Sequence, residues 1–304
     1  MQKEIIEVKL YMIGLGKMGY RLAENMRDNG HQVVGYDVNE EVVAKFKEEK
    51  FEVIESIEEL KNIQEKKVIW VMLPAGKITN STLKKIKDFV ASEGDIVIDG
   101  GNSDYQDSIK HAEEFEKKGI SFLDVGTSGG TYGARNGASF MIGGNENAYK
   151  ELEEFFKSIS VENGTIYTGK SGSGHYLKVI HNAILHSMLE ILGEGFDLLN
   201  ASPFNYNLKD VAFNWKESAV IRGWLMDLAY DAFSKNQKLD DVETVIHSSS
   251  ACIEAQKSAF ELNIPVPMFN ITLLMRQRTQ QQETFSASVI NSLRREIGGY
   301  RSKN

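Results

Sequence analysis

Three glycines at a fixed spacing are the first residues of this sequence whose pattern could do chemistry. They belong to Gly14-Leu15-Gly16-Lys17-Met18-Gly19, which directly follows an apolar run ending at Ile13. In a G-x-G-x-x-G turn between a strand and a helix, the first glycine permits the tight turn and the second lets the backbone approach a pyrophosphate. The third lets the helix pack closely on the strand. The helix N-terminus favours the phosphate charge. We therefore predict a dinucleotide site over these six residues.

An acidic residue at the end of the next predicted strand indicates which dinucleotide is preferred. Asp37 follows Gly19 by 18 residues, and no arginine occurs in the next four positions. A carboxylate there accepts hydrogen bonds from the adenosine ribose and repels a 2′-phosphate. We therefore expect NAD rather than NADP, with Leu73 and Asn102 as further cofactor contacts. The alternative interpretation is a structural glycine turn beside a surface aspartate.

Polar residues also follow two later predicted strands, where ligands bind in open α/β sheets. Asn102 comes just after Ile96–Asp99 and could bridge cofactor and substrate. It could instead cap the next helix, unless Ser103 supplies that cap. Ser128, Gly129 and Gly130 could form a small cradle for a substrate carboxylate, or simply a flexible loop.

One face of a long predicted helix carries a lysine, a histidine and an amide. Lys178, His181 and Asn182 are separated by three and four residues, which places them together on one side of the helix. A buried lysine can lose its proton and then accept one from a substrate hydroxyl. His181 and Asn182 could hold substrate hydroxyls. The alternative is a surface lysine beside a core histidine.

The surrounding elements suggest how these residues are positioned. Strand-like and helix-like segments alternate up to about residue 170, which predicts a Rossmann-type α/β domain with a mostly parallel sheet. From Gly174 the pattern becomes helical. We therefore expect a dinucleotide-binding domain over residues 1–170 and an all-helical substrate and dimerisation domain over 171–304.

Composition narrows the functional classes. The chain has 304 residues, 41% hydrophobic and 26% charged, with a net charge of −8. This balance gives no basic field for nucleic acid, and no run is long enough to span a membrane. Cys252 is the single cysteine, which fits a reducing cytoplasm. No cluster of residues has metal-ligand spacing, so we expect no metal and a small anionic substrate.

Together these motifs resemble the short, NAD-preferring bacterial 6-phosphogluconate dehydrogenases of the β-hydroxyacid dehydrogenase superfamily. The resemblance covers nearly the whole chain, including Gly35–Asn39, Asp99–Ser103, Gly174–Lys178 and Thr284–Gly299. It implies a Rossmann domain followed by a helical domain that dimerises. The implied reaction is oxidation at C3 of a sugar acid, followed by loss of C1 as carbon dioxide.

The resemblance also implies roles for particular residues. Lys178 would be the general base, and Arg276 together with Arg294 of the partner subunit would hold a phosphate. The remaining substrate ligands would be Asn102, Ser128, Gly129, Gly130, His181 and Asn182.

Four departures leave the reaction open, one of them Tyr300 in place of a histidine of the family near the C-terminus. Leu185 replaces the family's acidic glutamate, His186 replaces a tyrosine on the phosphate, and Ser250–Ala255 lacks a cation. His186 could be a replacement acid. Glu190 lies twelve residues after Lys178, about 120° round the helix, and cannot simply substitute. Two alternatives therefore remain: a β-hydroxyacid dehydrogenase without decarboxylation, and a non-catalytic NAD-binding regulator.

Overall fold

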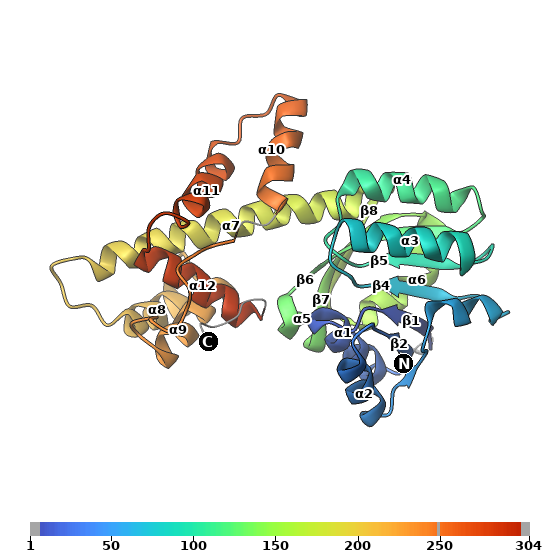
Figure 1. The fold of residues 1–304 in the computed structure, drawn as a ribbon. Helices are drawn as coiled ribbons and strands as arrows, with labels where there is room; N and C mark the ends of the chain where they lie inside the picture. Colours follow the sequence, from blue (N-terminus) through green and yellow to red (C-terminus); the bar gives the residue numbers. More distant parts are fainter. Residues whose placement is uncertain (1–6, 248–249, 299–304) are drawn as a thin grey trace. The chain divides into compact units, whose positions relative to one another are not determined.

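The computed structural model describes residues 7–247 and 250–298 of the chain. The chain divides into two compact units, Met1–Lys178 and Val179–Asn304. The first is an α/β unit and the second is helical, with the helix α7 (Ser173–Asn200) beginning in the first unit and continuing in the second (Figure 1).

Among the described residues, eight strands form one sheet in the order β3-β2-β1-β4-β5-β6-β7-β8. All neighbouring strands are parallel except β6 and β7, which are antiparallel. The strands are β1 (Lys9–Ile13), β2 (Gln32–Tyr36), β3 (Glu52–Val53), β4 (Val68–Val71), β5 (Ile96–Asp99), β6 (Ser121–Ser128), β7 (Ala138–Gly144) and β8 (Ser160–Gly169).

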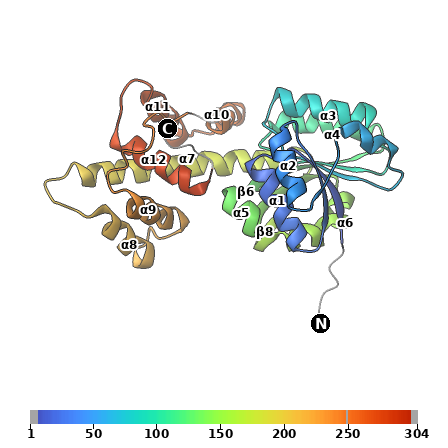
Figure 2. The same cartoon turned by 60° about the horizontal axis from the view of Figure 1, so that its bottom comes forward.

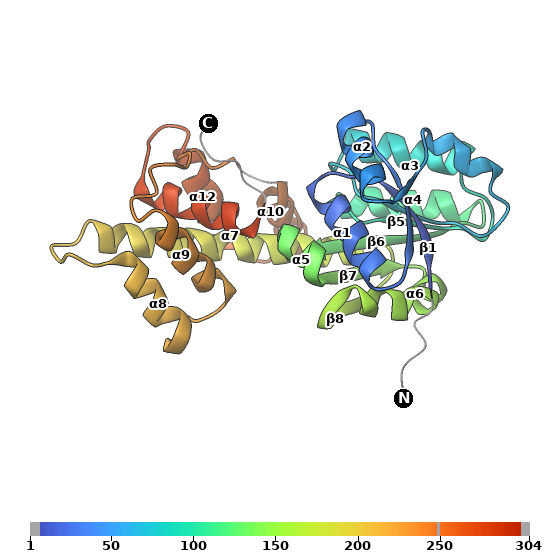
Figure 3. The same ribbon diagram turned by 90° about the horizontal axis from the view of Figure 1, so that it is seen from below.

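Helices cover both faces of this sheet, because its buried strands are apolar on both sides. One face packs against α1 (Lys17–Asp28), α2 (Glu40–Glu48), α5 (Gly130–Asn136) and α6 (Glu146–Ser158) (Figure 3). The other packs against the 3₁₀ helix η1 (Ile57–Asn62), α3 (Lys77–Phe89) and α4 (Tyr105–Glu116), with α3 and α4 side by side (Figure 2).

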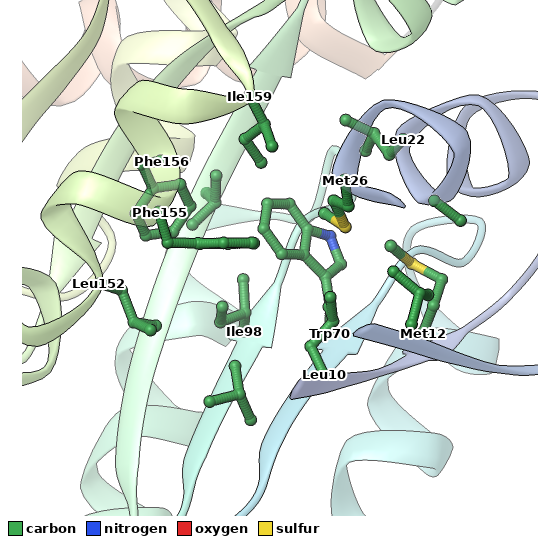
Figure 4. Packing of buried hydrophobic residues seen from close by; sticks show 14 of the residues in the cluster. Leu10, Met12, Leu22, Met26, Trp70, Ile98, Leu152, Phe155, Phe156 and Ile159 are labelled. Carbon is green, nitrogen blue, oxygen red and sulfur yellow. The ribbon is translucent and has the colours of Figure 1, made fainter. Parts of the chain in front are cut away.

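Trp70 of β4 lies at the centre of the first of these cores. Its ring is fully buried, and it contacts Phe140, Phe155 and Phe156 at centroid distances of 5.7–6.3 Å. Leu10 and Met12 of β1 and Met26 of α1 surround it (Figure 4). This packing fixes β4 in the middle of the sheet, between β1, which precedes the glycine turn, and β5, which precedes Asn102.

The helical unit has a core of its own, and the described helices that follow α7 have the bounds α8 (Leu208–Ser218), α9 (Trp224–Lys235), α10 (Ser250–Leu262), α11 (Pro267–Arg278) and α12 (Phe285–Ile297). Leu189 and Phe196 of α7 pack with apolar residues of α8, α9 and α12. Figure 3 shows these three helices beside α7. Val179 and Ala183 of α7 pack instead with Cys252 of α10. No helix within the described ranges has the length and apolar character needed to cross a bilayer.

The predicted fold class, a mostly parallel sheet followed by a helical domain, is confirmed. Two local details differ from expectation. The sequence pattern predicts a strand over Ser121–Val125, whereas β6 continues to Ser128 because its end pairs with β7, with Ser128 opposite Ser139. The Ser128–Gly130 segment also leads directly into a helix, α5, which the glycine-rich sequence did not suggest. Ala134 on that helix is buried in the core. Tertiary packing therefore outweighs the low helix propensity of the glycine-rich segment.

Candidate active site

The glycine turn joins β1 to α1 and is held tightly against the rest of the sheet. Gly14 has a φ of +103°, a conformation that favours glycine, and its N–H donates to the Tyr36 carbonyl at 2.8 Å. A Cβ at Gly19 would overlap the Gly14 carbonyl, whereas one at Gly16 would meet nothing within 4 Å. No side chain caps α1, which begins at Lys17. Gly16 therefore lies both beside open space and at the N-terminus of a helix, and a bound pyrophosphate requires both.

Asp37 lies next to this turn and organises it. One carboxylate oxygen accepts the Leu15 N–H at 2.7 Å, and the other accepts the Asn39 N–H at 2.9 Å. Each carboxylate oxygen has a second lone pair, so hydroxyl donors can still be accepted. Of the other predicted cofactor residues, Leu15 is buried, Met18 and Leu73 are half-buried, and Lys17 is exposed. The structure thus brings the predicted acid and the predicted glycine turn together.

The loops after β5 and β6 meet at the same edge of the sheet. Asp99 at the end of β5 lies opposite Asp124 of β6, and Thr127 donates to the Gly100 carbonyl at 3.2 Å. Asn102 is exposed on the β5 loop. The cap of α4 is Asp104, which accepts the Gln106 N–H at 2.8 Å, so neither Asn102 nor Ser103 has that role. Asn102 is therefore not committed to capping.

The Ser128–Gly130 segment is half-buried at the end of β6. Gly129 has a φ of +109° and occupies the N-cap position of α5, where no side chain provides a cap. The segment is thus an ordered strand-to-helix turn. Its role as a small anion cradle stays a prediction.

Lys178 is a buried cation of this unit, which also buries Lys67 in an ion pair with Asp95. It lies in the second turn of α7 with only 6% of its surface exposed. A Cβ added at Gly126 of β6 would lie 2.5 Å from the Lys178 Cβ, so the lysine stem rests on the strand two residues before Ser128. Burial lowers the pKa of the Lys178 amine from 10.5 to about 7. Near neutral pH a large fraction of this amine is uncharged and can accept a proton.

Two buried residues that the sequence pattern did not single out, Asp124 and His175, anchor α7 beside β6. The fully buried Asp124 accepts the Gly172 N–H at 2.7 Å and the His175 N–H at 2.9 Å, which ties β6 to the start of α7. His175 in turn contacts the Ser108 hydroxyl of α4 at 2.7 Å through Nδ1. Burial raises the pKa of Asp124, while His175 and the two N–H groups oppose this. An acid inside an otherwise apolar strand was the available signal.

The predicted residues further along α7 lie in the helical unit. The side chains of Asn182 and the half-buried His181 form a hydrogen bond, with 3.1 Å between Asn182 Oδ1 and His181 Nδ1. His186 Nδ1 lies 3.5 Å from the Cys252 sulfur of α10. Leu185 packs against the helical core. The helix thus presents no carboxylate at position 185.

The two predicted phosphate ligands have very different surroundings. Arg276 of α11 is only 1% exposed, and its Nε donates to Glu190 Oε1 of α7 at 2.8 Å. Arg294 of α12 is half-buried and donates to Asn291 Oδ1 at 3.0 Å. The Glu190 partner of Arg276 was not foreseen, because the two residues are 86 positions apart in the sequence.

Two family models match consecutive parts of the chain. The model described as the NAD binding domain of 6-phosphogluconate dehydrogenase matches residues 9–169. The model described as the 6-phosphogluconate dehydrogenase C-terminal domain matches residues 174–296.

Full-length relatives and a solved structure agree with these matches. A Bacillus subtilis protein provisionally named 6-phosphogluconate dehydrogenase YqeC is 40% identical over 96% of this chain and 98% of its own. The Haloferax volcanii NAD(+)-dependent, decarboxylating 6-phosphogluconate dehydrogenase is 35% identical over 96% and 97%. The solved Plasmodium falciparum 6-phosphogluconate dehydrogenase, described with NADP+ and with 6-phosphogluconate, has a TM-score of 0.78 and 26% identity. The match covers 89% of this chain and 62% of that longer one.

Replacing Lys178 with methionine is expected to stabilise the protein in a pH-dependent way. The lysine pKa is about 7 in the fold against an ordinary 10.5, so the unfolded chain binds an extra proton between these values. The wild type therefore gains stability as pH rises from about 7 to about 10, and loses it as pH falls. At pH 6 the variant should unfold with a free energy roughly 2 kcal/mol or more above that of the wild type. The difference should shrink towards pH 10 in urea titrations. The exposed Lys170→Met variant is the control and should show no such trend.

Replacing Gly16 with alanine should separate folding from dinucleotide binding. The added methyl meets no atom of the chain, so the free energy of unfolding should change by less than about 0.5 kcal/mol. The same methyl would occupy the space for a pyrophosphate, so NAD should bind about tenfold or more weakly by calorimetry. Gly195→Ala, which also meets no neighbour, serves as the control. Unchanged NAD affinity in the Gly16 variant would contradict the predicted site.

Proposed function

Since the chain belongs to the 6-phosphogluconate dehydrogenase family, we propose that it oxidises 6-phosphogluconate or a closely related sugar acid with NAD and releases carbon dioxide. Oxidation of the hydroxyl at C3 places a carbonyl β to the carboxylate. That carbonyl can accept the electrons of the breaking C1–C2 bond, so the acid can lose carbon dioxide. The protein's tasks are then to remove the hydroxyl proton, hold the substrate and exclude water.

The single observation that carries this proposal is the buried amine of Lys178. Its pKa is lowered to about 7 by burial, so it is partly uncharged at neutral pH. A general base is most effective with a pKa near the working pH. Lys178 would accept the hydroxyl proton during oxidation and return a proton to the enediolate left by decarboxylation.

The residues around Gly16 fit an NAD molecule. A Cβ at Gly16 would fill otherwise open space at the α1 N-terminus, and Asp37 lies next to the same turn. When bound there, NAD supplies the hydride acceptor. Asp37 would accept hydrogen bonds from the ribose and repel a 2′-phosphate, which supports a preference for NAD over NADP.

Polar groups near the strand ends and on α7 would hold the substrate. Asn102 and the Ser128–Gly130 turn would bind its carboxylate, and His181 with Asn182 would bind its hydroxyls. His186 would serve as a proton donor. Leu185 favours a second candidate function, oxidation of a β-hydroxy acid without decarboxylation, because its side chain packs into the helical core and cannot donate a proton.

We also propose separate roles for the two domains and a homodimeric assembly. Residues 1–170 would bind the dinucleotide, and 171–304 would bind substrate and dimerise. Support for a homodimer comes from apolar residues exposed at helical spacing on α7 and α11, namely Ile184, Met188, Ile191, Met268, Ile271 and Leu274. A cytoplasmic location is favoured by the free, buried state of Cys252.

The cofactor preference is tested by Asp37→Asn. The amide oxygen can still accept the Leu15 N–H, but the charge that repels a 2′-phosphate is gone. The ratio of NAD to NADP affinity should fall by about tenfold. Glu40→Gln, at an exposed neighbour of the turn, is the charge-matched control. An unchanged ratio would argue against contact between Asp37 and the ribose.

The reaction itself is tested by supplying NAD with a panel of sugar acids and other β-hydroxy acids. We expect NADH and carbon dioxide in equal amounts from the preferred sugar acid. Activity should rise as pH increases through about 7, because the amine of Lys178 must lose its proton before it can act as a base. Lys178→Met should lose about 100-fold or more in kcat, with NAD affinity retained.

The outcomes separate the candidates. NADH without carbon dioxide would support the second function. Full activity in Lys178→Met, with Lys170→Met as its exposed control, would contradict the role of Lys178 as general base. NAD binding without NADH production from any acid would favour a non-catalytic NAD-binding regulator.

A further inference from the structure

A buried ion pair joins α7 and α11 in the interior of the helical unit. Glu190 is 6% exposed and Arg276 is 1% exposed, and the Arg276 Nε lies 2.8 Å from Glu190 Oε1. One turn before each of them, Thr272 donates to the Ser187 hydroxyl at 2.8 Å, and both of these residues are also buried. A polar seam thus connects the two helices, with the charges of the pair directed at each other.

The guanidinium of Arg276 is committed within the protein. Arginine stays protonated in proteins, so its buried charge needs an anion. Burial raises the pKa of Glu190, and the hydrogen bond and charge of Arg276 act in the opposite sense. Arg276 Nη2 is buried without a hydrogen-bond partner. Glu190 therefore already supplies the counter-charge of the guanidinium, through the hydrogen bond that it accepts from Nε.

The groups around the pair add no net positive charge to it. Burial raises the pKa of Cys252, which keeps its thiol neutral. That thiol lies 3.5 Å from Nδ1 of His186, at the two positions where the sequence departs from the expected phosphate ligands. Arg294 and Glu194 both act electrostatically on Glu190, with opposite signs. The four charges Glu190, Glu194, Arg276 and Arg294 sum to zero.

A phosphate dianion needs cations whose charge is not already balanced. To use Arg276, it would have to be stripped of water and displace Glu190, leaving a buried carboxylate without a partner. We propose that Glu190 holds Arg276 as an internal ion pair, so that the site takes a hydroxy acid of the sugar-acid class that carries no phosphate group. This inference rests on the proposed function and narrows its substrate.

A matched pair of ligands tests the inference by binding alone. D-gluconate and 6-phospho-D-gluconate differ only in the phosphate, and each is titrated calorimetrically into the full chain saturated with NADH, where no turnover occurs. We expect wild type to bind gluconate at least as tightly as the phosphorylated acid. Phosphogluconate binding tenfold or more tightly than gluconate overturns the proposal, and so does the failure of both acids to bind.

Charge variants show whether Glu190 is the cause. Glu190→Gln leaves Arg276 uncompensated and should raise the affinity for phosphogluconate relative to gluconate about tenfold. The exposed Glu194→Gln, which removes the same charge from the same helix, should leave the ratio unchanged. An unchanged ratio in a folded Glu190→Gln overturns the proposal.

A second variant covers the case in which Glu190→Gln does not fold, as judged by circular dichroism and NAD binding. The double variant Glu190→Gln with Arg276→Gln removes both charges and should keep the wild-type ratio of phosphogluconate affinity to gluconate affinity. Loss of phosphogluconate affinity in this double variant overturns the proposal. The proposed function fails separately, through the absence of NADH production from any acid, which leaves the binding ratios readable.

Discussion

The contact between the Asp124 carboxylate and the start of α7 is the constraint on which the position of Lys178 depends. Asp124 and Gly126 are two residues apart in β6 and therefore face the same side of the sheet. The first accepts the N–H groups of Gly172 and His175, and the second makes room for the Lys178 stem. A Cβ at Gly174 would overlap the Asp124 and Met141 carbonyls, so helix and sheet meet backbone to backbone. The raised pKa of Asp124 shows that burying this carboxylate is unfavourable. In return, the second turn of α7 is held in one place against β6.

Two buried cations in this chain illustrate opposite solutions to the cost of burial. Lys178 can give up its charge, and burial alone lowers its pKa to about 7. Arg276 cannot, so it keeps its charge and is paired with Glu190. The consequence for function follows from this difference. A lysine that is neutral part of the time can take up a proton, whereas an arginine whose charge is balanced inside the protein has little left to offer a ligand. Chemical role is therefore set by the partner as much as by residue type.

The sequence was most informative where chemistry depends on spacing along the chain. The glycine turn, Asp37 after β2, and the α/β-then-helical order could all be predicted, because local periodicity and fixed offsets determine them. The contacts that fold these parts together could not. Asp104 rather than Ser103 caps α4, because the loop continues one residue further before the helix begins. Asp124 was seen only as part of a strand, and Glu190 was excluded as a replacement acid without its true partner in view. The contacts of Asp124 and Glu190 depend on residues far away in the sequence, where no periodicity operates.

β4 determines how the two ligand loops are spaced, although it carries few candidate site residues. Its Trp70 indole lies where a Cβ at Gly100 would be, and the Leu73 carbonyl that follows the strand lies 3.0 Å from a Cβ at Gly101. On its other side, the Met72 carbonyl and the Leu73 side chain close against Gly14. The segment Trp70–Leu73 is therefore wedged between the dinucleotide turn and the loop of Asn102. Because Trp70 is itself locked among Phe140, Phe155 and Phe156, the core fixes the gap between these loops. A substitution that moved this indole would alter the gap without touching any ligand.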